Sequence, residues 1–231
     1  MGEGVGNEAE VLPYVSSCNI ACGGHAGDKA TMRWVVSIAK KHQVKIGAHP
    51  SYPDMPNFGR VSMDLPPNEL IGIVREQIAQ LVSICTEEGV KLHHIKAHGA
   101  LYNDIAKGGD LAQVFLEAIE PYKAAIFLYV PAGSEFSKLA INKGFKTKSE
   151  AFGDRNYNND LSLVSRKNDN ALIIAPKLVL EHVLRMVREQ KVLTVSGRLE
   201  DMHADTYCIH GDTPNALQIL TYLSKELPQL K

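Results

Sequence analysis

Short apolar runs alternate with longer amphipathic segments along most of the chain, and this alternation restricts the fold more than any other feature. The runs have the length and composition of buried β-strands and cover residues 18–22, 44–48, 92–96, 125–130, 145–150, 192–195 and 206–209. Strands that alternate with helices pair in parallel through right-handed crossovers. The pattern therefore predicts an α/β fold built on a parallel sheet.

The segments between and after the runs carry four predicted amphipathic helices. Asp28 is expected to cap the first, whose apolar face comprises Met32, Val35, Val36 and Ala39. Pro67 begins and Gly89 ends the second, whose apolar face comprises Leu70, Ile73, Val74, Ile78, Leu81 and Cys85. The third covers residues 176–189, with inward-facing Val179, Val183, Met186 and Val187. The fourth begins at Thr213-Pro214 and buries Leu217, Leu220 and Leu223.

Nothing in the sequence divides the chain, because it contains no internal repeat, no low-complexity tract and no linker rich in proline or glycine. We therefore expect a single domain over residues 1–231. Residues 152–170 depart from the alternating pattern, since they are polar and rich in asparagine. A segment of this length is either a functional lid or a surface excursion with a small hairpin, and the sequence leaves both open.

Charge and hydropathy exclude several classes of protein. The chain has 25 Lys and Arg residues against 26 Asp and Glu residues, so no basic excess is available to bind a nucleic-acid backbone. No apolar run approaches the roughly 20 residues that cross a bilayer, and the first residues do not have the pattern of a secretion signal. We therefore expect neither nucleic acid nor membrane as a partner, and a cytoplasmic location.

The four cysteines are too few for a disulfide framework in a chain of 231 residues. Cys18 and Cys22 would share one face of a strand. No second closely spaced pair is present to complete a zinc site with them. We expect both to be buried, reduced thiols.

Side chains suited to catalysis or ligand binding follow five of the predicted strands. They are Gly24, His25 and Asp28 after the first strand, His49 and Tyr52 after the second, Lys96 and His98 at the third, Asp154 and Arg155 after the fifth, and His210 and Asp212 after the last. In open α/β sheets and (β/α) barrels, ligands bind at the carboxyl ends of the strands. We therefore expect these side chains to meet in one site.

Each of these residues also has a structural interpretation. The glycines around His25 favour function, because they let the backbone approach a ligand closely. A hydrogen-bonded core histidine is the alternative for His49 and His98, and helix capping is the alternative for Asp28 and Thr213. Three further histidines are interpreted as surface or packing residues: His42, His93 and His182.

Lys96 is the most informative single position. An ammonium group at the inner end of a strand is costly unless it is paired, and burial would lower its pKa. The candidate partners are Asp154, Asp205 and Asp212. Such a pair is suited to proton transfer or to orienting an anionic substrate.

Several familiar catalytic motifs are absent from the sequence: the G-x-x-x-x-G-K-[ST] phosphate loop, H-E-x-x-H and G-x-S-x-G. The segment Gly2-Glu3-Gly4-Val5-Gly6 has neither the spacing nor the preceding strand of a dinucleotide loop. The available His, Asp, Lys and Arg side chains favour general acid–base catalysis or metal-assisted attack by water.

Taken together, six ordered motifs resemble the LamB/YcsF family over essentially the whole chain. They are residues 17–28 (SCNIACGGHAGD), 47–54 (GAHPSYPD), 58–60 (FGR), 96–103 (KAHGALYN), 152–155 (FGDR) and 210–214 (HGDTP). The resemblance implies a (β/α)7 TIM-like barrel similar to the glycoside hydrolase/deacetylase fold. Because Met1 stands immediately before Gly2-Glu3-Gly4, we expect the first barrel strand to be missing.

The resemblance also implies an activity and partners. The family provides the A component of ATP-dependent 5-oxoprolinase, a hydrolase that cleaves the cyclic amide 5-oxo-L-proline to L-glutamate as ATP becomes ADP and phosphate. It works with subunits B and C, and we expect ATP, the co-substrate, to be bound with these partners. The catalytic candidates are His25, His49, His98 and Asp212 for acid–base steps and Lys96 for holding a carboxylate or phosphate. The substrate-binding candidates are Gly24, Asp28, Tyr52, Arg60, Asp154, Arg155 and His210.

Two other functions remain open on the sequence. The clusters of His and Asp also suit a metal-dependent deacetylase or amidohydrolase of the same fold, which would need a divalent metal. The expected loss of the first strand suits a non-catalytic regulatory subunit. The sequence leaves open both the requirement for a metal and the assembly of several copies into a homo-oligomer.

Overall fold

The computed structural model describes residues 1–227. The chain forms two compact units, which we call unit 1 (Met1–Thr147) and unit 2 (from Lys148 onward). Each unit is described by itself, and the single domain expected over residues 1–231 stays a prediction.

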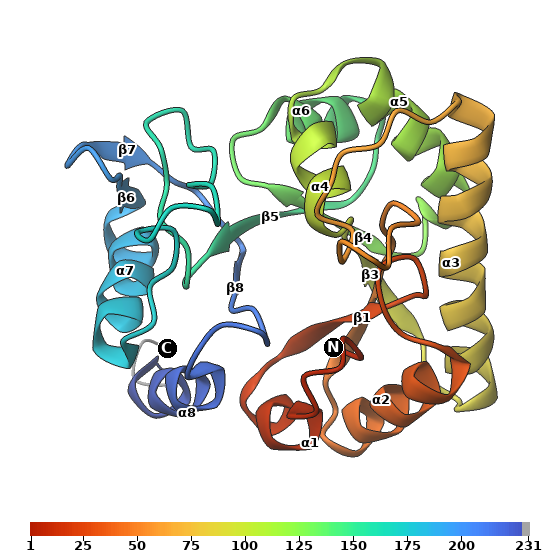
Figure 1. Ribbon diagram of the computed structural model, residues 1–231, viewed down its shortest axis with the longest axis horizontal. Coiled ribbons are helices and arrows are strands. Elements are labelled where there is room, and N and C mark those ends of the chain that lie inside the picture. Colours follow the sequence, from red (N-terminus) through yellow and green to blue (C-terminus); the bar gives the residue numbers. More distant parts are fainter. Residues whose placement is uncertain (228–231) are drawn as a thin grey trace. The chain divides into compact units, whose positions relative to one another are not determined.

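Unit 1 is built on four parallel strands (Figure 1), in the order β1 (Ser17–Ala21), β2 (Lys45–His49), β3 (Leu92–Ile95) and β4 (Phe127–Pro131). Each overlaps a predicted strand. The parallel pairing follows from the helices that separate consecutive strands in the sequence. The four carboxyl ends consequently lie at the same edge of this sheet.

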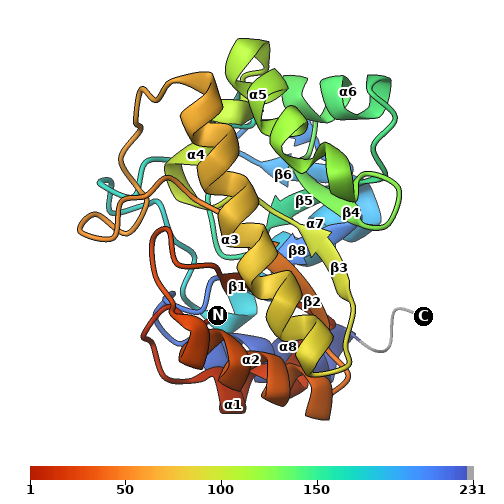
Figure 2. The ribbon, with the colours of Figure 1, turned by 90° about the vertical axis from the view of Figure 1, so that its right-hand side faces the viewer.

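The helices of unit 1 are α1 (Glu8–Val11), α2 (Lys29–Lys41), α3 (Pro67–Glu87), α4 (Gly99–Ala106), α5 (Gly109–Ile119) and α6 (Glu135–Asn142), with 3₁₀ turns at Leu12–Tyr14 and Glu120–Tyr122. As predicted, Asp28 caps α2 by accepting a hydrogen bond from the Thr31 amide. The predicted apolar face of α2 is buried, and this helix packs against α3 and against β1 and β2. Figure 2 shows α3 running along the outside of the strands.

The start of α3 at Pro67 is confirmed, and Gly89 follows the helix at a φ of +68°. That left-handed conformation is the one that glycine supplies after a helix end. Five of the six predicted apolar positions on α3 are buried, whereas Ile73 is half-buried.

Unit 2 pairs β5 (Thr147–Phe152) with β8 (Thr206–Cys208) in parallel, with Ala151 opposite Tyr207. Its helices, α7 (Pro176–Glu189) and α8 (Ala216–Glu226), pack against each other. The bounds of α7 are those predicted. The prediction that Val187 faces inward is wrong, because Val187 is exposed and His182 is buried on this helix instead.

The apolar run at residues 192–195 forms part of a strand, but not of a parallel sheet. It contributes to β6 (Lys191–Leu193), which pairs antiparallel with β7 (Leu199–Asp201), a strand not predicted. In the polar segment that follows β5, antiparallel bridges join Arg155 to Leu172 and Tyr157 to Leu163. This is the small hairpin that the sequence left open beside a lid.

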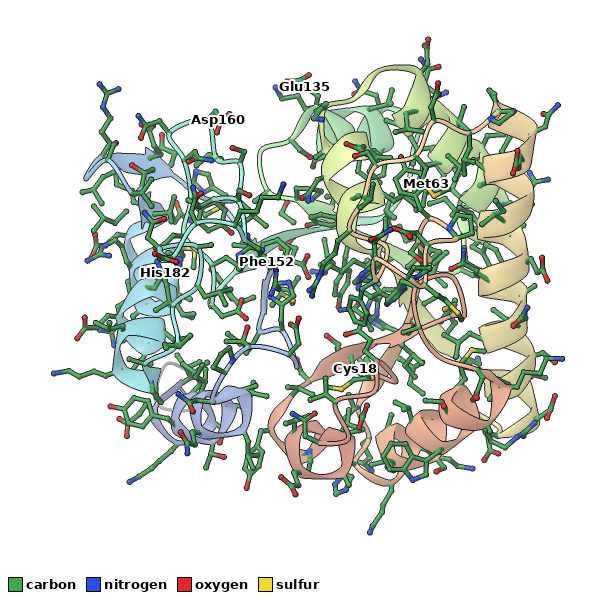
Figure 3. All side chains as sticks on the ribbon, viewed as in Figure 1. Cys18, Met63, Glu135, Phe152, Asp160 and His182 are labelled. Atoms are coloured by element: carbon green, nitrogen blue, oxygen red, sulfur yellow. The ribbon has the colours of Figure 1, made fainter. Side chains whose placement is uncertain are left out.

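The α/β fold class is confirmed by parallel strands with intervening helices in unit 1 and by the parallel β5–β8 pair in unit 2. Cys18, labelled on β1 in Figure 3, and Cys22 are buried and unpaired by disulfides, as predicted. Burial raises the pKa of each thiol to about 12, which keeps both protonated. Within residues 1–227, no helix has the length and apolar character needed to cross a membrane.

Candidate functional site

Unit 1 brings together three of the predicted catalytic histidines and one carboxylate, which we call the histidine cluster: Glu3, His25, His49 and His98. His25 lies in the loop after β1, His49 is the last residue of β2, and His98 follows β3 and precedes α4. Their convergence results from the parallel pairing, which places the ends of β1, β2 and β3 side by side.

The three imidazole rings are in direct contact and buried. Those of His25 and His98 stack with their centroids 3.5 Å apart and 3° between their planes. His49 meets His98 edge-on, and its Nε2 lies 3.0 Å from Nδ1 of His98. Phe58 packs edge-on against both His25 and His98, and so covers one side of the cluster.

A close backbone approach fixes the position of His98. The amide of Ala100, in the first turn of α4, donates a hydrogen bond to the carbonyl of Gly59. Gly99 has a φ of +57°, and a Cβ at this position would overlap that same carbonyl. Glycine at position 99 therefore permits the approach of the 54–60 loop, which also directs the Phe58 carbonyl toward His98.

His25 donates hydrogen bonds from both ring nitrogens. The Ser51 hydroxyl donates to the Tyr52 carbonyl, so its oxygen accepts from Nδ1 of His25 at 3.0 Å. At the other side, Nε2 lies 2.9 Å from Oε1 of Glu3. A carboxylate accepts only, so this contact is a charge-assisted hydrogen bond and holds Glu3 in the cluster.

The other two imidazoles are held in the neutral form. Burial, followed by the positive charge of His25, lowers the pKa of His98 to about 3. Burial, followed by the charges of His98 and Lys96, holds the pKa of His49 well below its usual range. At neutral pH, each therefore offers an unprotonated nitrogen.

Glu3 is a member of the cluster that the sequence analysis missed. Burial alone would raise the pKa of its carboxyl, but the Met1 ammonium and the hydrogen bond from His25 outweigh it and keep the group ionised. The flanking Gly2 and Gly4 both have a positive φ, and the Gly2 amide donates to the buried Glu8. The closely spaced glycines were the available signal of an unusual backbone around an acidic residue.

Lys96 is buried at the end of β3, as predicted, and its ammonium lies 5.3 Å from the centre of the Tyr102 ring. Its carbonyl accepts a hydrogen bond from Nδ1 of His49 at 2.7 Å. Lys96 is thus joined to the histidine cluster through its main chain. Its role in holding a carboxylate or phosphate stays a prediction.

The other predicted residues of unit 1 surround the cluster or lie outside it. A Cβ on Gly24 would come within 2.5 Å of Ser51 Oγ, so the absence of a side chain allows the loop to pack there. The buried Tyr52 donates to Asp104, and the guanidinium of Arg60 lies over the Phe58 ring. Asp28 is exposed at the start of α2 and acts there as a helix cap.

Unit 2 holds a second constellation, centred on the fully buried Asp154. Its carboxylate accepts from the amide and Nδ1 of His210 and from the Thr213 hydroxyl. Burial alone would raise the pKa of Asp154, but the charge of His210 and these hydrogen bonds outweigh it and lower the pKa to about 2. The carboxylate fixes the ring of His210, which remains partly exposed. We call this pair the Asp154–His210 dyad.

Two further predicted residues of unit 2 have partners that account for part of their chemistry. Arg155 is buried, and its guanidinium donates to the carbonyls of Val164 and Ala171. It therefore holds the polar segment after β5 in place. Asp212 lies 3.5 Å from the guanidinium of Arg166, in a partly exposed ion pair. The anion-binding role of Arg155 and the acid–base role of Asp212 stay predictions.

The chain is similar to named proteins over nearly its whole length. The sequence model of the LamB/YcsF family matches residues 1–231. The A component of 5-oxoprolinase from Pyrococcus furiosus is 39% identical over 225 residues, which cover 97% of this chain and 88% of the relative. The A component of 5-oxoprolinase from Shouchella clausii is 44% identical over 223 residues, covering 96% and 88% respectively.

A solved structure extends this similarity to the fold. The lactam utilization protein from Thermus thermophilus matches with a TM-score of 0.90 and 36% sequence identity. The match covers 97% of this chain and 90% of that protein. This agreement confirms the TIM-like fold that the resemblance implied.

Proposed function

The chain belongs to the LamB/YcsF family, and from that premise we propose that it is the A component of an ATP-dependent 5-oxoprolinase. Its substrate is 5-oxo-L-proline, which it opens to L-glutamate while ATP is converted to ADP and phosphate. The observation that supports this most directly is the histidine cluster, in a chain 39% to 44% identical to proteins of that name. The name of those relatives also supports a complex with further subunits, here B and C.

The reaction determines what the protein must supply. A five-membered lactam is an amide that resists water, and transfer of a phosphoryl group from ATP to its oxygen activates the carbonyl carbon. Hydrolysis then needs a group that activates water and a proton donor for the departing ring nitrogen. We assign ATP binding to a site formed with the partner subunits.

The histidine cluster is suited to the hydrolytic half of this reaction. His49 and His98 present unprotonated nitrogens, which provide electron pairs for activating water. His25 donates from both ring nitrogens and is the proton-donating side of the cluster. Lys96, joined to His49 through its carbonyl, provides the cation for a substrate carboxylate.

Reconstitution tests this function. The purified chain is mixed with subunits B and C, ATP and 5-oxo-L-proline, and both glutamate and phosphate are measured. We expect glutamate only when all three subunits and ATP are present. Glutamate formation by this chain alone without ATP would instead support a metal-dependent amidohydrolase, and no glutamate from the complete mixture of folded subunits would refute the proposal.

A matched pair of lysine variants tests the assignment within the chain. Lys96→Ala removes the buried ammonium, whereas Lys91→Ala removes an exposed one from the residue just before β3. We expect the first variant to raise the KM for 5-oxo-L-proline at least tenfold and the second to leave it unchanged. Equal KM values in Lys96→Ala and the wild type would rule out carboxylate binding by Lys96.

A further inference from the structure

Three electron-pair donors of the histidine cluster converge on a single point. Oε1 of Glu3, Nε2 of His49 and Nδ1 of His98 all lie within 4.8 Å of one another. They come from three separate parts of unit 1: the segment before α1, the end of β2 and the start of α4. The two histidines are buried and Glu3 is half-buried.

Hydrogen bonds to main-chain carbonyls fix which nitrogen of each histidine carries the proton. Nδ1 of His49 lies 2.7 Å from the Lys96 carbonyl, and Nε2 of His98 lies 2.9 Å from the Phe58 carbonyl. A carbonyl oxygen can only accept, so each of these nitrogens is the donor. The remaining nitrogens, Nε2 of His49 and Nδ1 of His98, therefore bear lone pairs in the neutral rings.

These two lone pairs face each other at 3.0 Å. Two neutral acceptors cannot hydrogen-bond to each other, and a carboxylate oxygen 3.7 Å from His98 adds a third acceptor. The contact requires a positive centre between the groups. That centre is either a proton shared by the two rings or a metal cation, and the strong burial of both rings disfavours the proton.

We propose that Glu3, His49 and His98 bind one divalent first-row transition metal ion. Two imidazoles and one carboxylate form a donor set for zinc, manganese, iron or cobalt, whereas magnesium and calcium prefer oxygen ligands alone. Ligands about 2.1 Å from a tetrahedral ion lie roughly 3.4 Å from one another. The separations of 3.0 Å and 3.7 Å at His98 lie on either side of that value.

His25 is the positioning residue of this site. Its Nε2 holds the Glu3 carboxylate while Ser51 holds its Nδ1, and its ring lies flat against His98. Outer hydrogen bonds of this kind orient metal ligands, and their loss typically costs about 10–100-fold in affinity. The proposal does not rest on the 5-oxoprolinase function, because metal binding is measured on the chain alone.

Direct binding to the full chain tests the proposal. The protein is stripped with a chelator and titrated at pH 7.5 with zinc, manganese, cobalt or magnesium ions alone. We expect one transition-metal ion per chain, tight binding of at least one of the three, and a visible cobalt absorption spectrum typical of nitrogen and oxygen ligands. Failure of all three transition metals to bind would overturn the proposal and leave the shared proton as the explanation.

Variants locate the ion. We expect Glu3→Gln and His98→Asn each to weaken binding at least tenfold and His25→Gln to weaken it about 10–100-fold, whereas Glu10→Gln and His42→Asn, both at exposed positions, leave it unchanged. Anomalous diffraction from wild-type crystals soaked in cobalt provides a readout that needs no variant. A peak among Glu3, His49 and His98 supports the proposal, and a peak elsewhere, or unchanged affinity in the ligand variants, refutes it.

Discussion

The sequence places the same dipeptide at two strand ends, His98-Gly99 in unit 1 and His210-Gly211 in unit 2, yet the two are built differently. His98 is buried among other imidazoles, and burial lowers its pKa to about 3. His210 is partly exposed and donates to the buried carboxylate of Asp154. The first arrangement exposes a lone pair to a cation or a reacting group, whereas the second holds a ring by its proton. The surroundings, not the motif, set the chemistry.

The largest expected difference between the two constellations is in activity. His25→Gln removes the donor that holds Glu3 and the ring that stacks on His98. We expect kcat of the assembled 5-oxoprolinase to fall by about 10²–10⁴, the usual contribution of positioned acid–base groups. His210→Gln keeps a donor for Asp154, and we expect a loss on the order of tenfold, the value of one hydrogen bond.

Glutamate release measured at saturating substrate checks this ranking, with His42→Gln as the control on the surface of unit 1. A His25→Gln enzyme within threefold of the wild type would show that the histidine cluster is structural. A larger loss in His210→Gln than in His25→Gln would move the centre of the reaction to unit 2.

The glycines of the two dipeptides provide the next comparison. Gly99→Ala must place a Cβ against the Gly59 carbonyl at a φ of +57°, whereas a Cβ on Gly211 would meet no atom within 4 Å. Left-handed strain costs about 1–3 kcal/mol and overpacking a similar amount. We therefore expect Gly99→Ala to lower the free energy of unfolding by roughly 2–5 kcal/mol and Gly211→Ala to change it by less than about 0.5 kcal/mol.

Urea unfolding of both variants measures this difference. Equal costs would mean that the approach of the 54–60 loop to α4 contributes nothing to stability. The position of His98 would then have to be fixed by its side-chain contacts alone.

Asp154→Asn tests the charge of the dyad. The asparagine keeps the shape but accepts fewer hydrogen bonds, and we expect a loss of about 1.5–3 kcal/mol in the free energy of unfolding at pH 7. The pKa of Asp154 is lowered to about 2 in the folded protein. Its stabilising contribution is therefore complete above its ordinary pKa of 3.8 and is lost as the pH falls toward 2.

The measurement is chemical unfolding of Asp154→Asn and the wild type between pH 7 and pH 3. We expect a constant difference down to about pH 4 and a narrowing below it. Asp169→Asn, an exposed carboxylate of the same unit, serves as the control. A difference independent of pH over the whole range would show that Asp154 acts through shape rather than charge.

Local patterns in the sequence predict much of the fold. The cap at Asp28 and the bounds of α7 follow from residue types within one helix. The partner of a strand is a different matter, because the apolar residues at 192–195 are compatible with either kind of pairing and the structure pairs β6 with β7 in a hairpin. Burial of His182 in place of Val187 likewise depends on what packs against α7.

The site divides in the same way. His25, His49 and His98 were identified because each stands at a strand end, and parallel pairing brings strand ends together. Glu3 was missed because it reaches His25 across 22 positions from a segment without a strand pattern. The partners of Arg155 are main-chain carbonyls, and any residue type can supply those. Residue types therefore indicate where chemistry collects, but not which side chains complete it.

His182 sharpens the comparison at the smallest scale, because it is a buried imidazole in unit 2 without the support that His98 has. Its Nε2 has no hydrogen-bond partner within residues 1–227, and burial lowers its pKa to about 4. The unfolded chain therefore takes up a proton below about pH 6.5 that the folded protein refuses until about pH 4, at a cost of about 1.4 kcal/mol per pH unit. His182→Leu should change the free energy of unfolding by less than about 1.5 kcal/mol at pH 7.5 and make its decline between pH 6.5 and pH 4 shallower. Melting temperatures at several pH values, with His203→Gln as the exposed control, measure this decline. Because His49 and His98 still refuse protons in the variant, part of the decline must remain, and identical profiles for variant and wild type would assign all of it to unit 1.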